Sequence, residues 1–239
     1  VGAALSDFGG VTNKGAAFVF YGSSTLPTTS TYSVYFEYPG VDTSNGFANY
    51  VSSGGDVNGD GYPDIVIGAN VSQISGSNLG AAFIYWGGRN MEATSTQDKY
   101  FEYPSNNDNA YFGYSVSEAG DVNNDGFGDI IVGARDYYDS SKAATTGAAW
   151  IYFGGKTPNT TPDVYLEYPG TDDANFGWFV SQAGDVNNDG YDDVVIGAYL
   201  SSYDVGTNRG AAFVYYGSST MPATATHDAY LKYPGTDDA

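Results

Sequence analysis

The chain has no cysteine, one histidine and only eight lysines and arginines among its 239 residues. Without cysteine there are no disulfides, no thiol catalysis and no thiolate metal sites. Against those eight cations stand 28 Asp and Glu, and the formal net charge of −20 would repel a phosphate backbone, which excludes nucleic acid as a natural partner. No run of about 18 apolar residues is present, so the sequence predicts no membrane-spanning helix.

The sequence is instead rich in glycine and tyrosine and contains a strong internal repeat. The chain contains 33 Gly and 23 Tyr, and four markers recur along it. EYPG and its variants place Glu37, Glu102, Glu167 and Lys232 at steps of 65 residues. GAAFVF and its relatives, IGA or VGA, and a segment of the type FGYSVSEAGDVNNDG recur in the same order. The repeating unit is therefore about 65 residues long.

Each unit is predicted to supply four strands. The runs FGYSVSEAG, DIIVGA, GAAWIYFGG and VYLEYPG are β-branched or aromatic and are bounded by Gly, Pro, Asn and Asp. Four strands with turn-rich joints are typical of a β-propeller blade, which buries both faces on its neighbours. We therefore predict an all-β fold, a β-propeller built of four-stranded blades. A β-solenoid or an open stack of sheets is the alternative.

The phase of the repeat predicts an incomplete ring. One propeller region covers residues 1–239, with strands three and four of a partial blade at 1–45 and full units at about 46–110, 111–174 and 175–239. The final YPGTDDA lacks the NFGW that follows the same letters at 168–174. We therefore expect the remaining blades to come from a longer parent chain or from another chain.

Each full unit contains an acidic loop of the form D-x-N-x-D-G-x-x-D. Oxygens at positions 1, 3, 5 and 9 and a backbone carbonyl at position 7 can converge on one hard cation, and the Gly at position 6 permits a sharp turn. This spacing predicts three Ca²⁺ sites. The candidate ligands are Asp56, Asn58, Asp60, the Tyr62 carbonyl and Asp64; Asp121, Asn123, Asp125, the Phe127 carbonyl and Asp129; and Asp185, Asn187, Asp189, the Tyr191 carbonyl and Asp193.

Other calcium modules and a plain turn are the alternatives for these loops. A helix-loop-helix module and a dockerin-type module both need a helix after the loop, and the former needs a Glu at position 12. Position 12 is Ile67, Val132 or Ile196 inside an apolar β run, so both modules are rejected. An Asp/Asn/Gly turn that binds nothing is the simpler reading. Three copies with the same five positions filled argue against it.

On these motifs the chain resembles the FG-GAP repeat family, the blades of integrin α-subunit heads and of many bacterial secreted and surface proteins. The residues that carry the resemblance are Phe112-Gly113 with Gly133-Ala134 and Phe176-Gly177 with Gly197-Ala198, on either side of the acidic loop. Two departures stand out: Phe47-Ala48 in the first full unit, and Asn70, Arg135 and Tyr199 where the family has Pro. The resemblance implies propellers commonly of seven blades, structural calcium at the blade edge, and ligand binding on the opposite loops or between blades.

Catalytic motifs are scarce. His227, the one histidine, is expected to be a solvated loop residue, and no G-x-S-x-G elbow is present. The acid pairs Asp172-Asp173 and Asp237-Asp238 recur at one repeat position, as polar turns do and as glycosidase carboxylates do not. The sequence therefore predicts a protein that is not an enzyme.

Two functions remain open, both extracellular or at the cell surface, where millimolar calcium suits weak sites. The first is a calcium-binding propeller for adhesion or for binding a protein or glycan ligand. Segments of unlike sequence at one repeat position, 70–79, 135–146 and 199–209, are its predicted binding loops. The second is a structural surface or filament protein that assembles with copies of itself, with calcium loops that stabilise the repeats.

Overall fold

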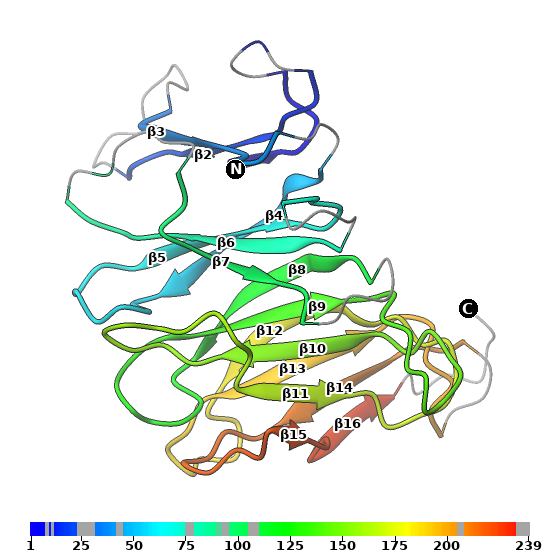
Figure 1. Ribbon diagram of the computed structural model, residues 1–239. Coiled ribbons are helices and arrows are strands. Elements are labelled where there is room, and N and C mark those ends of the chain that lie inside the picture. Colours follow the sequence, from blue (N-terminus) through cyan, green and yellow to red (C-terminus); the bar gives the residue numbers. More distant parts are fainter. Residues whose placement is uncertain are drawn as a thin grey trace.

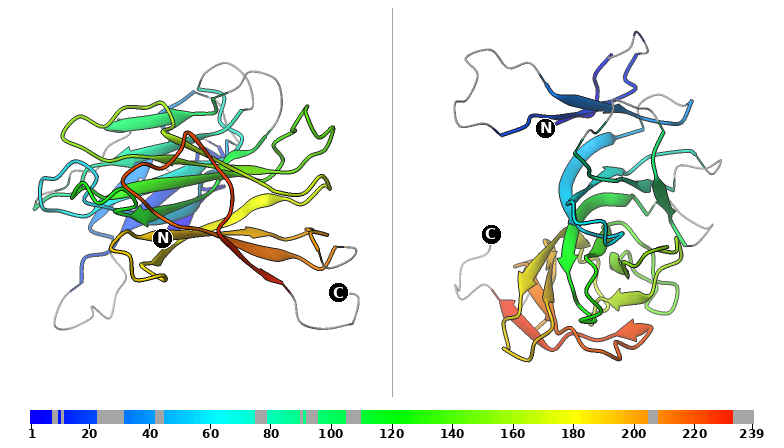
Figure 2. Two further views of the ribbon diagram at one scale, coloured as in Figure 1. Left: turned by 90° about the horizontal axis from the view of Figure 1, so that it is seen from below. Right: turned by 90° about the vertical axis from the view of Figure 1, so that its left-hand side faces the viewer.

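The computed structural model describes residues 1–7, 10, 12–22, 32–41, 45–74, 79–89, 91, 96–104, 110–204 and 208–232. Its main elements in these ranges are all β-strands, in four sheets that follow one another along the chain (Figure 1). The first and last sheets lie at opposite ends of this row (Figure 2). The predicted all-β architecture, propeller blades that do not close into a ring, is confirmed. No helix in the described ranges is long and apolar enough to cross a membrane.

The three full blades each pair four strands in chain order. The second blade contains β4 (Phe47–Gly55), β5 (Asp64–Ala69), β6 (Ala81–Tyr85) and β7 (Lys99–Glu102). The third contains β8 (Phe112–Gly120), β9 (Asp129–Ala134), β10 (Ala148–Tyr152) and β11 (Val164–Glu167). The fourth contains β12 (Phe176–Gly184), β13 (Asp193–Ala198), β14 (Ala211–Tyr215) and β16 (Ala229–Lys232), while β15 (Thr224–Ala225) crosses back to pair with β11 in parallel.

The first sheet has three strands where two were expected. They are β1 (Gly2–Ala3), β2 (Ala16–Val19) and β3 (Val34–Glu37). Gly2 and Ala3 correspond to the Gly-Ala that ends strand two of every other unit, and they pair with Ala17 and Ala16. The partial blade therefore keeps the end of its second strand.

The hydrophobic core is divided among the joints between sheets, with one cluster in each of the three joints. β9 and β10 are buried at every position, because the third blade is covered on both faces. β13 and β14 of the last blade alternate between buried and partly exposed positions. The stack thus follows the propeller rule that a blade is stabilised by its neighbours.

The phenylalanine of each FG motif lies at the centre of a joint. Phe47, Phe112 and Phe176 are all 0% exposed. Each packs against the tyrosine of the preceding EYPG marker, with ring centroids 5.8, 6.2 and 5.9 Å apart; these tyrosines are Tyr38, Tyr103 and Tyr168. Aromatic pairs of this kind contribute about 0.5–1.5 kcal/mol beyond the area they bury. The EYPG marker and the FG-position phenylalanine therefore contact each other across the joint between two blades.

The glycine of the FG motif lets two blades approach closely. Gly113 and Gly177 have left-handed backbone, with φ of 78° and 84°. A Cβ on Gly113 would lie 2.2 Å from the carbonyl oxygen of Ala81. The first full unit has Ala48 at this position, and it adopts the same conformation with φ of 65°.

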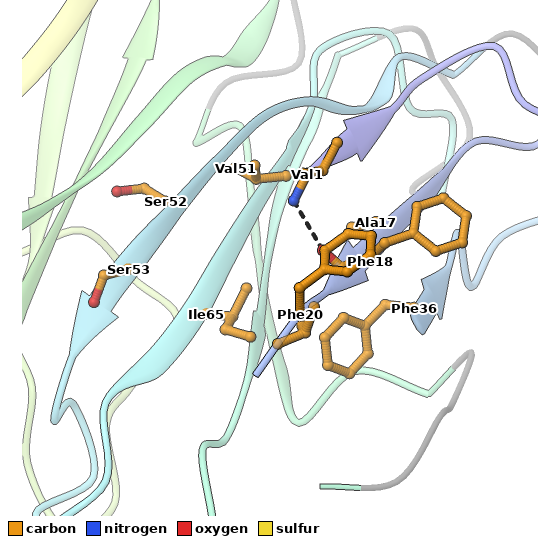
Figure 3. A pocket seen from close by; sticks show the side chains of 10 residues that line it. Val1, Ala17, Phe18, Phe20, Phe36, Val51, Ser52, Ser53 and Ile65 are labelled. Atoms are coloured by element: carbon orange, nitrogen blue, oxygen red, sulfur yellow. Dashed lines mark hydrogen bonds between the residues drawn. The ribbon is translucent and has the colours of Figure 1, made fainter. Parts of the chain in front are cut away.

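A cleft of about 440 Å³ lies between the first sheet and the second blade (Figure 3). Phe18, Phe20 and Phe36 line one side of it, and Val51 and Ile65 line the other (Figure 3). Its remaining lining residues are aliphatic or bear hydroxyl groups, so no lining side chain ionises near neutral pH.

Candidate metal-binding loops

The three acidic loops join the first and second strands of successive blades. Each loop follows the innermost strand, β4, β8 or β12, and leads into β5, β9 or β13. The segments 70–79, 135–146 and 199–209 begin at the other ends of β5, β9 and β13. Within these predicted binding loops, residues 75–78 and 205–207 lie outside the described residues. Acidic loops and variable segments are therefore separated by the length of a six-residue strand, about 20 Å.

Hydrogen bonds within the loop hold positions 1 to 7 in a compact turn. In the second loop Asp121 accepts from the N–H groups of Asp125 and Gly126, both at 2.9 Å. Asn123 Oδ1 also accepts from Asp125 N at 2.9 Å, and Asp125 Oδ1 accepts from Phe127 N at 3.0 Å. The first and third loops repeat all four bonds at 2.9–3.0 Å. The shared residues thus produce one loop conformation three times.

Left-handed backbone at positions 4 and 6 explains the glycine and asparagine there. The position-6 glycines, Gly61, Gly126 and Gly190, have φ of 88°, 90° and 93°. Position 4 has φ between 56° and 73° and is occupied by Gly59, Asn124 and Asn188. Gly and Asn are the residues that adopt this conformation at least cost.

The position-9 carboxylates, Asp64, Asp129 and Asp193, are buried in all three loops, at most 1% exposed. One oxygen of Asp129 accepts from Val122 N, at position 2, at 2.9 Å. The other accepts from Gly154 N, in the turn after β10, at 2.8 Å. Asp64 and Asp193 make the same two bonds in their own blades. Position 9 therefore attaches the loop to the third strand of its blade.

The position-9 carboxylates of the first two loops have raised pKa values. Burial raises the pKa of Asp129 to about 7; its bonds to Gly154 and Val122 oppose the shift, and the charges of Asp125 and Asp121 add to it. For the same reasons the pKa of Asp64 is raised to about 6. Burial therefore disfavours the charged form of these two carboxylates, and a bound cation would favour it.

The donor set fits calcium in its chemistry, although it is not preassembled. Every predicted ligand lies in its loop or at the first residue of the following strand. In the described part of the chain, however, no three His, Cys, Asp or Glu side chains converge as a metal cage. Each loop does offer carboxylate, amide and carbonyl oxygens within nine residues, the all-oxygen set that hard cations take. Ligation requires the side chains at positions 1, 3 and 5 to turn toward the ion, whereas the position-9 carboxylate has lone pairs left for an ion while it accepts its two N–H bonds.

Sequence reasoning missed a second set of structural aspartates. Asp98, Asp163 and Asp228 accept N–H bonds of 2.7–2.8 Å across the turn between the third and fourth strands of their blades. Their donors are Trp86, Phe153 and Tyr216. The signal was present, because these aspartates are 65 residues apart.

At the opposite end, the acid pair Asp172-Asp173 joins loops of two blades. Asp172 accepts from Tyr168 Oη at 2.8 Å and from Ser202 N at 2.7 Å. Asp173 accepts from Thr145 N at 2.7 Å. The pair therefore has the structural role expected of a polar turn. Its counterpart at 237–238 lies outside the described residues.

Aromatic side chains gather beside the variable segments. The Arg135 guanidinium lies 4.2 Å from the ring centroid of Tyr114 and 4.5 Å from that of Trp178. Phe179 and Tyr199 nearby are 57% and 61% exposed. His227 lies in the loop before β16, as expected, but it is only partly exposed and packs edge-on against Tyr203, Phe213 and Tyr230 at centroid distances of 5.3–5.8 Å. Its contacts are those of a packing residue.

Comparison with known proteins agrees with this architecture. Human integrin alpha-6 is 38% identical over 110 residues, 45% of this chain and 9% of that protein. Integrin alpha-4 of Xenopus laevis is 32% identical over 186 residues, 76% of this chain and 16% of that protein. Integrin alpha pat-2 of Caenorhabditis elegans is 33% identical over 193 residues, 76% of this chain and 15% of that protein. The chain thus spans less than a fifth of each relative.

The FG-GAP repeat family matches residues 48–85, 112–152 and 176–215. Each match runs from the first to the third strand of one full blade and includes its acidic loop. The chain therefore belongs to the FG-GAP repeat family.

Proposed function

We propose that this chain is a calcium-stabilised propeller region of an extracellular protein, with a role in adhesion or in binding a protein or glycan ligand. The observation that carries the proposal is the acidic loop, built three times with one hydrogen-bond pattern and a buried carboxylate at position 9. Calcium would be held by the oxygens at positions 1, 3, 5, 7 and 9 and would offset the repulsion among them.

The integrin α relatives support an extracellular setting and a role in recognition. The ligand surface that we assign is the end of the blades opposite the acidic loops. There the segments differ in sequence from blade to blade and expose rings such as Tyr199. Exposed aromatic rings beside hydrogen-bonding groups suit both sugars and proteins.

A non-enzymatic role is part of the proposal. Both acids of the pair Asp172-Asp173 accept backbone N–H bonds that join loops. General acid–base catalysis needs such groups free to exchange protons with a substrate.

Assembly with further blades is the second candidate, and the last blade's open face favours it. A Cβ on Gly68 or Gly133 would meet a backbone oxygen of the next blade at 2.1 or 2.3 Å. A Cβ on the equivalent Gly197 would meet only Phe179 of the same blade, at 3.8 Å. This face has the shape that would receive a blade of a second copy of the chain.

Calorimetric titration with CaCl₂, paired with thermal melts in calcium and in excess chelator, tests the proposed function. We expect heats of binding and a markedly lower melting temperature in chelator. A variant with Asp60→Asn, Asp125→Asn and Asp189→Asn should lose both effects while it still folds. An unchanged melt in chelator would remove the structural role of the loops. Light scattering on the same samples tests self-assembly, for which a monomer mass under both conditions is the contrary result.

A further inference from the structure

Hydrogen bonds connect the acidic loops of neighbouring blades. Between the second and third blades, Gly155 N donates to the carbonyl oxygen of Val57 at 2.8 Å. Between the third and fourth, Ser218 N donates to the carbonyl oxygen of Val122 at 2.9 Å. Val57 and Val122 occupy position 2 of their loops and are 1% exposed, so the loops meet at buried residues.

The residue before each of these donors binds a position-9 carboxylate of its own blade. Gly154 N donates to Asp129 at 2.8 Å, and Gly217 N donates to Asp193 at 2.9 Å. The other oxygen of Asp129 accepts from the N–H of Val122, and the carbonyl of Val122 accepts the bond from Ser218 of the next blade. Of two consecutive N–H groups, the first therefore binds the acidic loop of its own blade and the second binds the acidic loop of the preceding blade.

Together these contacts form one path of hydrogen bonds and consecutive peptide groups through all three position-9 carboxylates, which we call the loop-to-loop chain. All its bonds measure 2.8–2.9 Å. Its members in order are Asp64, Val57, Gly155, Gly154, Asp129, Val122, Ser218, Gly217 and Asp193. Only carboxylates and backbone groups take part. Displacement of one carboxylate therefore shifts backbone groups that also form hydrogen bonds with the neighbouring loop.

The joint between the third and fourth blades has an additional bond. Asp192, at position 8 of the third loop, accepts from Asp121 N at 2.9 Å, and Asp121 is position 1 of the second loop. In the preceding joint, position 8 is Gly128, which has no side chain and offers only its N–H to the carbonyl of Asp56 at 3.0 Å. Asp192 therefore holds a predicted ligand of the neighbouring blade without belonging to the predicted ligand set.

We propose that the three loops bind calcium cooperatively through the loop-to-loop chain, and that Asp192 is a positioning residue for Asp121. This inference rests on the proposed calcium binding and adds its regulation. A carboxylate ordered by binding in one loop holds the peptide groups that order the next, so neighbouring loops gain affinity from each other. Coupling between linked sites is commonly 5–150-fold, and we expect about fivefold or more between neighbours.

Variants that retain two loops test the coupling. Loops are disabled by Asp→Asn changes at positions 1 and 5, at Asp56 and Asp60, Asp121 and Asp125, or Asp185 and Asp189. Calcium titration then compares each two-loop variant with the two corresponding single-loop variants. For loops 121–129 and 185–193, the product of the two binding constants should exceed the product for the single-loop variants by about fivefold or more. For the non-neighbouring loops 56–64 and 185–193, the excess should be smaller.

Position 192 gives a sharper test in the variant that retains loops 121–129 and 185–193. Asp192→Ala should weaken the coupling. Asp192→Asn keeps an acceptor oxygen without the charge, so it should largely preserve the coupling. Asp173→Ala, which removes an aspartate with a similar backbone bond at the opposite end, should leave calcium binding unchanged. Equal losses in the Ala and Asn variants would show a charge effect and overturn the positioning role.

The two proposals fail differently. If no variant binds calcium, the proposed function falls, and this inference falls with it. If the single-loop variants bind and the neighbouring pair binds as two independent sites, only this inference is overturned. Circular dichroism of each variant in chelator verifies that the compared proteins are folded.

Discussion

At the scale of single residues, backbone conformation explains why small residues recur at the same positions of the repeat. Positive φ is required where the inner strand meets the preceding blade, and Gly113 satisfies it at a point where a side chain would strike Ala81. Ala48 holds the same conformation in the first full unit, where an L-residue is strained.

Gly113→Ala should destabilise the protein by about 2 kcal/mol or more, from left-handed strain and from the clash with the Ala81 carbonyl. A thermal melt should show a drop of several degrees for a chain of this size. Gly88→Ala is the matched control, because a Cβ there meets nothing within 4 Å. A Gly113→Ala protein as stable as this control would show that the backbones of the two blades are far enough apart at Gly113 to accept a methyl group.

Loop positions 5 and 9 should respond differently to truncation. Asp129→Ala leaves the N–H groups of Val122 and Gly154 without their acceptor, at a cost of about 2 kcal/mol or more. That loss should appear in calcium and in chelator alike. Asp125 is exposed and bonds only within its loop, so Asp125→Ala should destabilise the protein mainly in calcium. Denaturant melts under both conditions compare the two, and identical behaviour would contradict the distinction.

At the scale of secondary-structure elements, a tyrosine just after the fourth strand holds a loop of the next blade at the joints before the second and fourth blades. Tyr38 and Tyr168, just after β3 and β11, bond the Oγ atoms of Ser72 and Ser201 at 2.6 and 2.7 Å. The same rings pack on the FG phenylalanines of the following blade. One side chain thus contributes both packing and polar contact across a joint.

Tyr168→Phe should retain the packing and lose the hydrogen bonds to Ser201 and Asp172, for a loss of about 1–2 kcal/mol. Tyr138→Phe, at a residue that is 46% exposed, is the control and should be neutral. Chemical unfolding curves measure both. If the two variants match, the hydroxyl contributes nothing across this joint.

At the scale of the whole molecule, the excess of negative charge opposes the compact state. The formal charge is −20, and three calcium ions would bring it to −14. Self-repulsion of this kind is screened by salt.

In chelator, the melting temperature should therefore rise as NaCl is increased from about 0.05 to 0.5 M, where the Debye length falls to about 4 Å. In saturating calcium the rise should be smaller, because part of the charge is already neutralised. Differential scanning fluorimetry across the salt series provides the measurement. An equal slope in both conditions would argue against neutralisation by bound calcium.

The amino-acid sequence by itself determined the repeat, its four-strand unit, the incomplete ring and the loop spacing. It could do so because strand periodicity and turn chemistry are local: FGYSVSEAG alternates and DVNNDG turns wherever they occur. The same locality explains why the third strand of the first sheet was missed, since β1 is two residues long and is recognised only by its pairing with β2.

Only the tertiary structure decided which residues from different blades meet. The bonds from Gly155 N to the Val57 carbonyl and from Asp121 N to the Asp192 carboxylate join positions far apart in the chain. His227 lies in a loop as expected, but its packing was missed because its aromatic neighbours, Tyr203 and Phe213, come from other segments. The physical reason is that a blade packs on its neighbour through twist and close backbone approach, and these depend on the assembled sheets rather than on any local run of residues.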